Sequence, residues 1–409
     1  MKNKVSPLAP NKIKSMRSIP GINIYTYSAN LYKNSRLDVL FFLFDDEFNI
    51  AEVFTQSKTR SITLDWNEKN LKKGKVKAII VNAGNANTFT GDAGAKAMHK
   101  LVNFIGQKFD ILSSKIFVAS TGVIGEPFPF KKIINAVSKF DKAKKSNWLN
   151  AAKAIMTTDT FPKVSEASAM IDGKKVLIKG IAKGSGMIAP NMATMLGFIF
   201  TDANINRSVL QSILSEINEE TFNTISVDGD ESTNDTVMLI STNASKHKNI
   251  KNKNDRKLKD FVLKLKTIMG NLSEQIVRDG EGATKLVNIS VSGAKNTNSA
   301  KSIARSVAQS PLVKTAIYGE DPNWGRIVMA IGKSREPINK KKLKIKIGSE
   351  IVAKNGTQSP AYNESKLKNY MKNDQIIISI DLGIGKGTAK MMTCDYSYDY
   401  VRINASYKT

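Results

Sequence analysis

Short apolar runs and amphipathic stretches follow one another along the whole chain. Strands are predicted where apolar residues run together or alternate, at 38–44, 50–55, 77–81, 115–119, 176–181, 195–200, 236–241, 285–291, 326–331, 343–347, 375–382 and 388–396. Helices are predicted where apolar residues recur at three- and four-residue spacing, at 93–109, 131–140, 148–156, 206–222, from the basic linker 247–256 to about 269, at 301–307 and at 365–371. Because the two types mix without strict alternation, the pattern predicts an α+β layered architecture.

Three connecting segments complete this prediction. Residues up to about 35 contain three prolines and little periodicity, which is typical of an N-terminal arm. The acidic residues 45–47 separate two strand-like runs and predict a hairpin. The glycine-rich segment 383–387 has neither the spacing of an ATP-binding loop nor that of a dinucleotide-binding loop, so a hairpin turn is predicted there as well.

Composition narrows the class of protein. The chain has 409 residues, of which 41% are hydrophobic and 24% charged, an ordinary balance for a globular protein with a sizeable core. No apolar run approaches the roughly 18 residues of a membrane span, and the basic N-terminus lacks the apolar segment of a signal peptide. The single Cys394 fits a reducing compartment without requiring one. We therefore expect a cytoplasmic protein with no membrane partner.

The charge balance is unusual. There are 62 basic and 36 acidic residues, a formal net charge of +26, which raises the question of a nucleic-acid partner. The lysines are spread over nearly every segment, and their clusters lack the interleaved aromatic residues of a nucleic-acid stacking surface. A solvated basic surface is therefore expected, with no specific nucleic-acid partner, although a basic nucleic-acid-binding protein without catalysis stays open as an alternative.

The stretch 183–202, Lys-Gly-Ser-Gly-Met-Ile-Ala-Pro-Asn-Met-Ala-Thr-Met-Leu-Gly-Phe-Ile-Phe-Thr-Asp, organises the chain. It begins as a glycine- and proline-containing loop and turns at once into an apolar run suited to a buried strand. Thr194 lies at this junction, after the small residue Ala193. A self-processing nucleophile would be placed there, while the local pattern alone also fits an ordinary β-branched strand residue.

This stretch resembles the processing site of the ornithine acetyltransferase (glutamate N-acetyltransferase) family, in which the chain cuts itself before the Thr of Met-Ala-Thr-Met-Leu. Seven further segments resemble the same family in the same order, at 82–87, 120–125, 156–160, 226–236, 279–285, 319–326 and 400–409. The resemblance implies autoproteolysis between Ala193 and Thr194, giving an α chain of residues 1–193 and a β chain of residues 194–409. The expected fold is α+β, a layered α/β/β/α-type sandwich core with an additional smaller α/β domain.

The residue types are consistent with this chemistry. The chain has only two histidines, one in a predicted helix and one in a lysine-rich linker, so a Ser-His-Asp triad or a histidine-based metal site is not expected. A Thr freed by cleavage carries its own α-amine, whose pKa of roughly 7.7 to 8.0 suits a base for the hydroxyl. The hydroxyl of Thr194 would attack the carbonyl of Ala193 to give an ester that water opens.

The resemblance also implies the other site residues. Thr121 and Gly122 match the oxyanion pair, although a plain turn after a strand also fits them locally. The implied substrates are N2-acetyl-L-ornithine as acetyl donor and L-glutamate as acceptor, with acetyl-Thr194 as the intermediate. Residues that match the family's substrate contacts are Thr157, Lys183, Thr194, Glu281, Asn404 and Thr409.

Several properties stay open at this point. No bound cofactor or metal is expected, but acetyl-CoA is left open as a second acetyl donor, which would make the enzyme bifunctional. The partners implied are the small amino-acid substrates and the α and β chains themselves, in a heterotetramer of two α and two β chains. The alternative within the same chemistry is a self-cleaving amidohydrolase or aminopeptidase that passes acyl groups to water.

Overall fold

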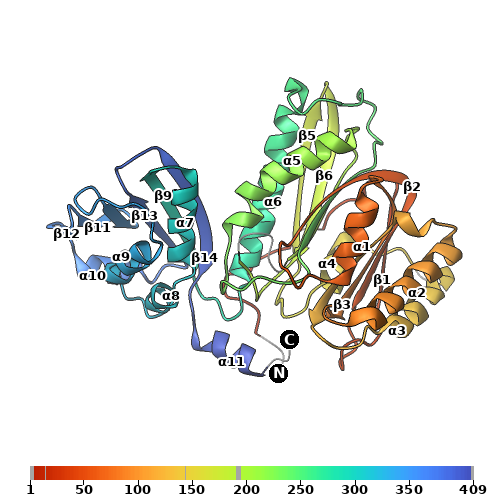
Figure 1. Ribbon diagram of the computed structural model, residues 1–409, viewed down its shortest axis with the longest axis horizontal. Helices are drawn as coiled ribbons and strands as arrows, with labels where there is room; N and C mark the ends of the chain where they lie inside the picture. Colours follow the sequence, from red (N-terminus) through yellow and green to blue (C-terminus); the bar gives the residue numbers. More distant parts are fainter. Residues whose placement is uncertain (1–3, 14, 143, 190–194, 407–409) are drawn as a thin grey trace.

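The computed structural model describes residues 4–13, 15–142, 144–189 and 195–406. Ala193, Thr194 and Thr409, three of the predicted site residues, lie outside the described residues. Two β-sheets organise the rest of the chain, and Figure 1 shows them side by side, the larger at the right and the smaller at the left.

The larger sheet contains eight strands, in the order β4-β3-β2-β8-β7-β6-β5 with β1 paired to β2. Their bounds are β1 Ile22–Tyr27, β2 Val39–Phe54, β3 Lys75–Asn85, β4 Ile116–Val123, β5 Lys163–Ile171, β6 Lys174–Lys183, β7 Leu196–Thr201 and β8 Thr236–Ser241. Strand β2 joins the two halves of the sheet, because residues 39–43 pair with β3 and residues 49–54 pair with β8.

The two halves of this sheet pack face to face. Successive strand residues point to opposite faces, so Phe42 of β2 and Phe198 and Phe200 of β7 turn inward, and the rings of Phe42 and Phe200 lie 4.8 Å apart. Trp148 of α4 (Trp148–Ala154) closes this inner core with its ring 5.1 Å from that of Phe200.

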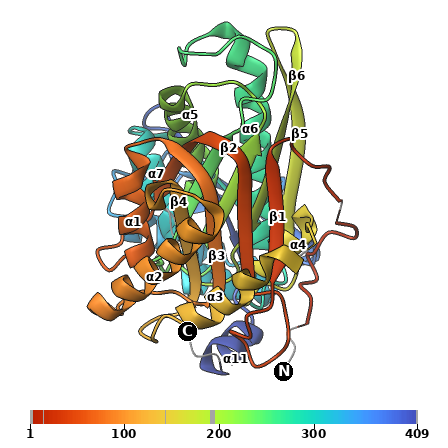
Figure 2. The same cartoon turned by 90° about the vertical axis from the view of Figure 1, so that its right-hand side faces the viewer.

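Helices cover the two outer faces. On one half, α2 (Gly91–Phe109) and α3 (Phe130–Val137) pack against β3 and β4, on the near side of the sheet in Figure 2. On the other half, α5 (Arg207–Glu220) and α6 (Lys259–Arg278) pack against β5 to β8. Helix α1 (Ile62–Leu71) lies against β4. The predicted α/β/β/α layering is therefore confirmed.

The smaller sheet has six strands in the order β12-β11-β10-β13-β9-β14. Their bounds are β9 Leu286–Ala294, β10 Lys344–Ile347, β11 Glu350–Lys354, β12 Thr357–Gln358, β13 Gln375–Asp381 and β14 Gly387–Cys394. The helices of this region are α7 Thr297–Ala308, α8 Pro311–Tyr318, α9 Trp324–Lys333 and α10 Glu364–Tyr370. They share one hydrophobic core with the sheet, which forms the expected smaller α/β domain.

The remaining elements are short or lie at the end of the chain. Four 3-10 turns are η1 Ser113–Lys115, η2 Ser138–Lys142, η3 Phe222–Thr224 and η4 Arg256–Leu258. Helix α11 (Tyr398–Ser406) follows β14 and lies at the bottom of the molecule in both Figures 1 and 2.

Some predicted elements are wrong. Residues 45–47 form no hairpin, since they belong to the continuous strand β2, where the pairing with β3 shifts between Leu43 and Phe48. Residues 326–331 are helical, not a strand, because Ile327, Ala330 and Ile331 of α9 are buried at helical spacing. The segment 383–387 forms no hairpin either, because β13 and β14 lie on opposite sides of β9. The predicted N-terminal arm contains strand β1.

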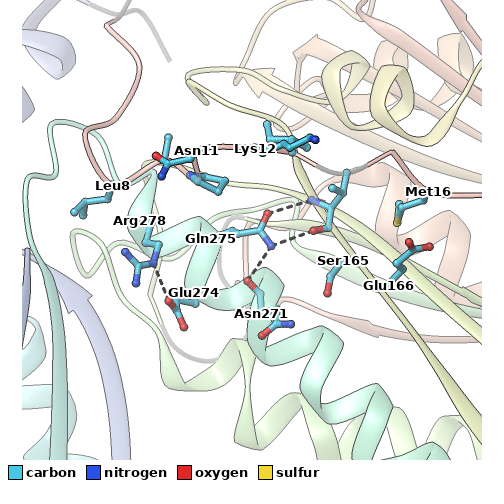
Figure 3. Close-up of a pocket in the computed structure, with 14 residues that line it drawn as sticks. Leu8, Asn11, Lys12, Met16, Ser165, Glu166, Asn271, Glu274, Gln275 and Arg278 are labelled. Atoms are coloured by element: carbon cyan, nitrogen blue, oxygen red, sulfur yellow. Dashed lines mark hydrogen bonds and ion pairs between the residues drawn. The ribbon is translucent and has the colours of Figure 1, made fainter.

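A hollow of about 700 Å³ lies between the N-terminal arm and helix α6. Gln275 of α6 exchanges hydrogen bonds with the backbone of Val164 in β5, and Figure 3 shows the ion pair of Arg278 with Glu274 near Gln275. None of the predicted site residues that the structure describes lines this hollow. Among the described residues, no helix has both the length and the apolar character needed to cross a membrane.

Candidate active site

A polar pocket of about 220 Å³ forms where the ends of β4 and β6 meet the loop before β8 and helix α11. Six of the predicted residues line it: Thr121, Gly122, Thr157, Lys183, Glu281 and Asn404. They come from segments far apart in the sequence, so the fold brings them together. Their neighbours in the lining include Ala86, Met187, Asp228, Asp230, Ser232, Thr233, Asn234 and Tyr400.

Thr121 and Gly122 lie near the end of strand β4, paired with β3. Gly122 has a φ of +131°, and a Cβ there would lie 2.4 Å from the carbonyl carbon of Gly84 in β3. Only glycine fits this position. The hydroxyl oxygen of Thr121 accepts a hydrogen bond from Lys183 Nζ at 3.1 Å. The proton of that hydroxyl has no acceptor among the hydrogen bonds of the described residues, so it is available to a group in the pocket.

Lys183 is buried at the end of β6, with 3% of its surface exposed. Burial lowers the pKa of this ammonium group, while the nearby carboxylates of Asp159, Asp235 and Glu281 oppose the shift. Little water surrounds this ammonium group, so it would attract a bound anion more strongly than an exposed lysine does.

Glu281 faces Lys183 from the loop after α6. Its Oε2 accepts a hydrogen bond from Asn404 Nδ2 of α11 at 2.8 Å, so the final helix is tied to the pocket. Gly186 lies against the same carboxylate, since a Cβ there would meet the Glu281 carboxyl group at 2.4 Å. The pocket thus presents a cation and a carboxylate to any small molecule inside it.

A fully buried ion cluster supports two loops of the pocket. Lys163 Nζ lies 2.6 Å from Asp159 Oδ1 and 2.6 Å from Asp279 Oδ2. Asp159 also accepts the backbone N–H groups of Thr157 at 2.9 Å and Gly184 at 2.7 Å. Burial raises the pKa of Asp159, but the charges of Lys163 and Lys183 outweigh it and hold the pKa below its ordinary value.

Asn234 connects the loop before β8 to both β3 and β4. Its Nδ2 donates to the carbonyls of Ala86 at 2.7 Å and Ser120 at 2.9 Å. Its Oδ1 accepts from the hydroxyls of Thr88 and Thr233 at 2.8 and 2.6 Å. Every polar atom of this buried amide is therefore used, which fixes the residue before Thr121 in place.

Asp228 holds the loop that leads to the predicted cleavage site. Its carboxylate accepts the backbone N–H groups of Met187 at 2.6 Å and Ile188 at 2.9 Å. Burial raises its pKa to about 6, against the effect of these bonds. The chain on the other side of the undescribed residues 190–194 is equally fixed, because Met195 is buried and its carbonyl accepts the N–H of Thr236 at 3.1 Å.

The two histidines lie away from the pocket, as the sequence predicts. His99 packs edge-on against Trp66 with ring centroids 5.0 Å apart. His247 Nε2 accepts the backbone N–H of Asn204 at 2.8 Å, so this residue fixes a loop. Within the described residues, no group of three or more His, Cys, Asp and Glu side chains is arranged to hold a metal ion.

Four buried residues around the pocket were missed by sequence reasoning: Lys163, Asp279, Asn234 and Asp235. Asn234, Asp235 and Asp279 lie within segments that the resemblance covers. The sequence therefore indicated the segments but not the contacts that these side chains make. Lys163 gave no signal, because a lysine in an alternating strand is expected on the solvent face.

The fold and this pocket define a class of protein, an α/β/β/α sandwich with a polar site for a small molecule beside its strand ends. The family model named ArgJ matches residues 24–409. The chain belongs to the ArgJ family, so the membership and the enzyme class expected from the resemblance are confirmed.

Two named relatives align with this chain over its full length. The arginine biosynthesis bifunctional protein ArgJ of Bradyrhizobium diazoefficiens is 46% identical over 413 residues, covering 100% of both chains. The protein of the same name from Brucella suis is 45% identical over 413 residues with the same coverage. A crystal structure of ArgJ from Bacillus halodurans is 43% identical and covers 50% of this chain and 96% of its own, with a TM-score of 0.48.

Proposed function

We propose that this chain moves an acetyl group from N2-acetyl-L-ornithine to L-glutamate through an acetyl ester on Thr194. The observation that carries the proposal is the convergence of six residues, chosen from the sequence alone, on one pocket of a protein that belongs to the ArgJ family. The relatives named above are arginine biosynthesis proteins, which agrees with these substrates.

The proposed nucleophile is created by self-cleavage between Ala193 and Thr194, which frees the α-amine of Thr194 as a base. The products are an α chain of residues 1–193 and a β chain of residues 194–409. They stay together because the larger sheet crosses the cut: β6 pairs with β7, and β2 pairs with β8. Two such pairs form the assembly that we propose, a heterotetramer.

Some of the pocket residues stabilise the transition state, and others bind the substrates. Thr121 and Gly122 stabilise the oxyanion, since the Thr121 hydroxyl proton has no acceptor among the described residues while Lys183 bonds to its oxygen. Lys183 pairs with a substrate carboxylate, and Glu281 holds a substrate ammonium group. Thr157, Asn404 and Thr409 are the remaining substrate contacts. N2-acetylornithine and glutamate each carry a carboxylate, which can pair with Lys183. Each also carries an ammonium group, which can pair with Glu281.

The test is an acetyl-transfer assay on the purified protein. Ornithine should appear from N2-acetylornithine, and N-acetylglutamate should appear in equal amount when glutamate is supplied. Release of free acetate at the same rate with and without glutamate would contradict the proposal and favour an amidohydrolase or aminopeptidase. A parallel assay with acetyl-CoA as the only donor decides whether this chain is bifunctional, as the names of its relatives suggest.

A further inference from the structure

Asp235 stands out among the buried carboxyl groups near the pocket. It follows Asn234 directly before β8, and only 1% of its surface is exposed. Its carboxyl group accepts the backbone N–H of Met195. Its Oδ2 has no hydrogen-bond partner among the described residues, although it is buried. An unpartnered buried carboxylate oxygen costs free energy, and such groups are commonly kept for a chemical role.

Covalent geometry brings this carboxyl group close to the predicted cleavage site. The nitrogen of Met195 is bonded to the carbonyl carbon of Thr194, so the nitrogens of these two residues are at most about 4 Å apart in any conformation. A hydrogen bond adds roughly 3 Å. The carboxyl oxygen bonded to the Met195 N–H is therefore separated from the nitrogen that cleavage would release by one hydrogen bond and one residue of chain.

Self-cleavage needs a base that is present before the cut. Until the bond breaks, the nitrogen of Thr194 is an amide and cannot accept a proton, so the α-amine that serves the later acetyl transfer is not yet available. A separate group must take the proton of the attacking hydroxyl.

Other ionisable groups around the pocket are exposed, as Asp230 is, or already engaged, as Asp228 is with the backbone N–H groups of Met187 and Ile188. The carboxylates of Asp159 and Asp279 are tied to Lys163. Glu281 accepts from Asn404. Lys183 donates to the Thr121 hydroxyl.

We propose that Asp235 is the proton acceptor for the self-cleavage step, a proposal that rests on the function proposed above. The carboxylate takes the proton of the Thr194 hydroxyl as the oxygen bonds to the carbonyl carbon of Ala193. When the carbon–nitrogen bond breaks, the same proton passes from Asp235 to the leaving nitrogen, which becomes the free amine. Water then adds its OH to the Ala193 carbonyl carbon and returns a hydrogen to the Thr194 oxygen.

The surroundings of Asp235 suit this role. Burial raises its pKa well above the ordinary value, which makes its carboxylate a stronger base than an exposed one. Two charged groups act on it: the ammonium of Lys183 on β6 lowers the pKa, and the carboxylate of Glu231 in the preceding loop raises it.

The test is a time course of self-cleavage after cell-free synthesis, followed by intact mass and denaturing gel, for wild type and Asp235→Asn. The amide can still accept the Met195 N–H but is not a base. Cleavage should slow by about 100-fold or more, the range of a lost general base. Hydroxylamine, which opens an ester, should not restore the rate, because the ester does not form.

Glu52→Gln is the matched control. Glu52 is also buried with one unpartnered carboxylate oxygen, but its Oε1 bonds to Asn67 and Thr236 instead of Met195. This variant should cleave at the wild-type rate, and Asp235→Glu should cleave at an intermediate rate.

The outcomes separate the two proposals. Wild type that transfers acetyl groups without being cut overturns the proposed function. If wild type and Asp235→Asn are cleaved at equal rates, only the role of Asp235 is overturned. Should Asp235→Asn lack the wild-type circular dichroism spectrum, the pH profile of wild-type cleavage decides: a rate that rises with pH as one carboxyl group ionises supports the proposal, and a flat rate between pH 5 and 8 overturns it.

Discussion

Replacing Thr121 by valine tests the oxyanion site most sharply. Valine has the shape of threonine but no hydroxyl, and Thr121 is buried, with 6% of its surface exposed, so the substitution leaves the packing of β4 in place. Removing one donor from an oxyanion site costs about 2.7 to 4 kcal/mol in the catalysed step. We therefore expect kcat to fall by about 100- to 1000-fold.

The structure predicts more than a loss of activity. Lys183 Nζ donates to the hydroxyl oxygen of Thr121 at 3.1 Å, so valine also leaves that ammonium group without its acceptor. Self-cleavage passes through the same kind of oxyanion, so it should slow together with acetyl transfer. KM for N2-acetylornithine should change by less than about threefold, because the hydroxyl acts on the transition state.

The assay is the initial rate of ornithine formation, divided by the amount of cleaved protein measured by intact mass. Thr121→Ser keeps the hydroxyl and is the control, expected to retain a kcat within about tenfold of wild type. A valine variant with a kcat within threefold of wild type would refute the oxyanion role of Thr121, whatever the state of its self-cleavage.

Three further predictions concern stability and binding. Lys163→Met leaves two buried carboxylates without their cation and should lower the free energy of unfolding in urea by about 3 to 5 kcal/mol, whereas Lys301→Ala, at an exposed ion pair, should leave it unchanged within error. Burial raises the pKa of Glu52 from 4.5 to about 8, so between these pH values the folded state holds a proton that the unfolded state loses. The free energy of unfolding should therefore fall by about 1.4 kcal/mol per pH unit as the pH rises between them. Glu52→Gln, compared with wild type by thermal melts, should lack that slope. Gly186→Ala places a methyl group 2.4 Å from the Glu281 carboxyl carbon and should raise KM for N2-acetylornithine about tenfold or more in steady-state assays, with unchanged KM counting against the role of Glu281.

The fold could be predicted where one local signal dominates. Strand β7 is fully buried and appears in the sequence as an uninterrupted apolar run. Helix α5 shows its buried positions at three- and four-residue spacing after the capping residue Asn206, whose side chain accepts the N–H of Ser208. In both elements, local preference and tertiary burial agree, so the pattern was sufficient.

Predictions failed where tertiary contacts override the local pattern. The acidic residues 45–47 look like a turn, yet they are the exposed middle of β2, and the strand stays continuous because the residues before them pair with β1 and β3 and the residues after them pair with β8. Helix α9 contains Ile327, Val328 and Met329 in succession, which resembles a strand, while only a helix buries Ile327 with Ile331. Strand β5 was missed because Lys163 begins it, and the burial of that lysine depends on carboxylates 4 and 116 positions away in the sequence.

The site was predictable to the extent that motifs carry it. The resemblance selected the six pocket residues, but no periodicity or spacing would have indicated that Thr121, Lys183 and Asn404 meet. The supporting groups depend on three-dimensional pairing: Asn234 bonds to carbonyls of two other segments, and Asp235 bonds to Met195 across neighbouring strands.

The most direct test of the central claim is intact mass spectrometry of purified active protein, before and after incubation with N2-acetylornithine in the absence of glutamate. We expect two polypeptides, the second beginning at Thr194, and a gain of one acetyl group on Thr194 that disappears when glutamate is added. One continuous polypeptide in fully active material, or an acetyl group on any residue of the first chain, would contradict it.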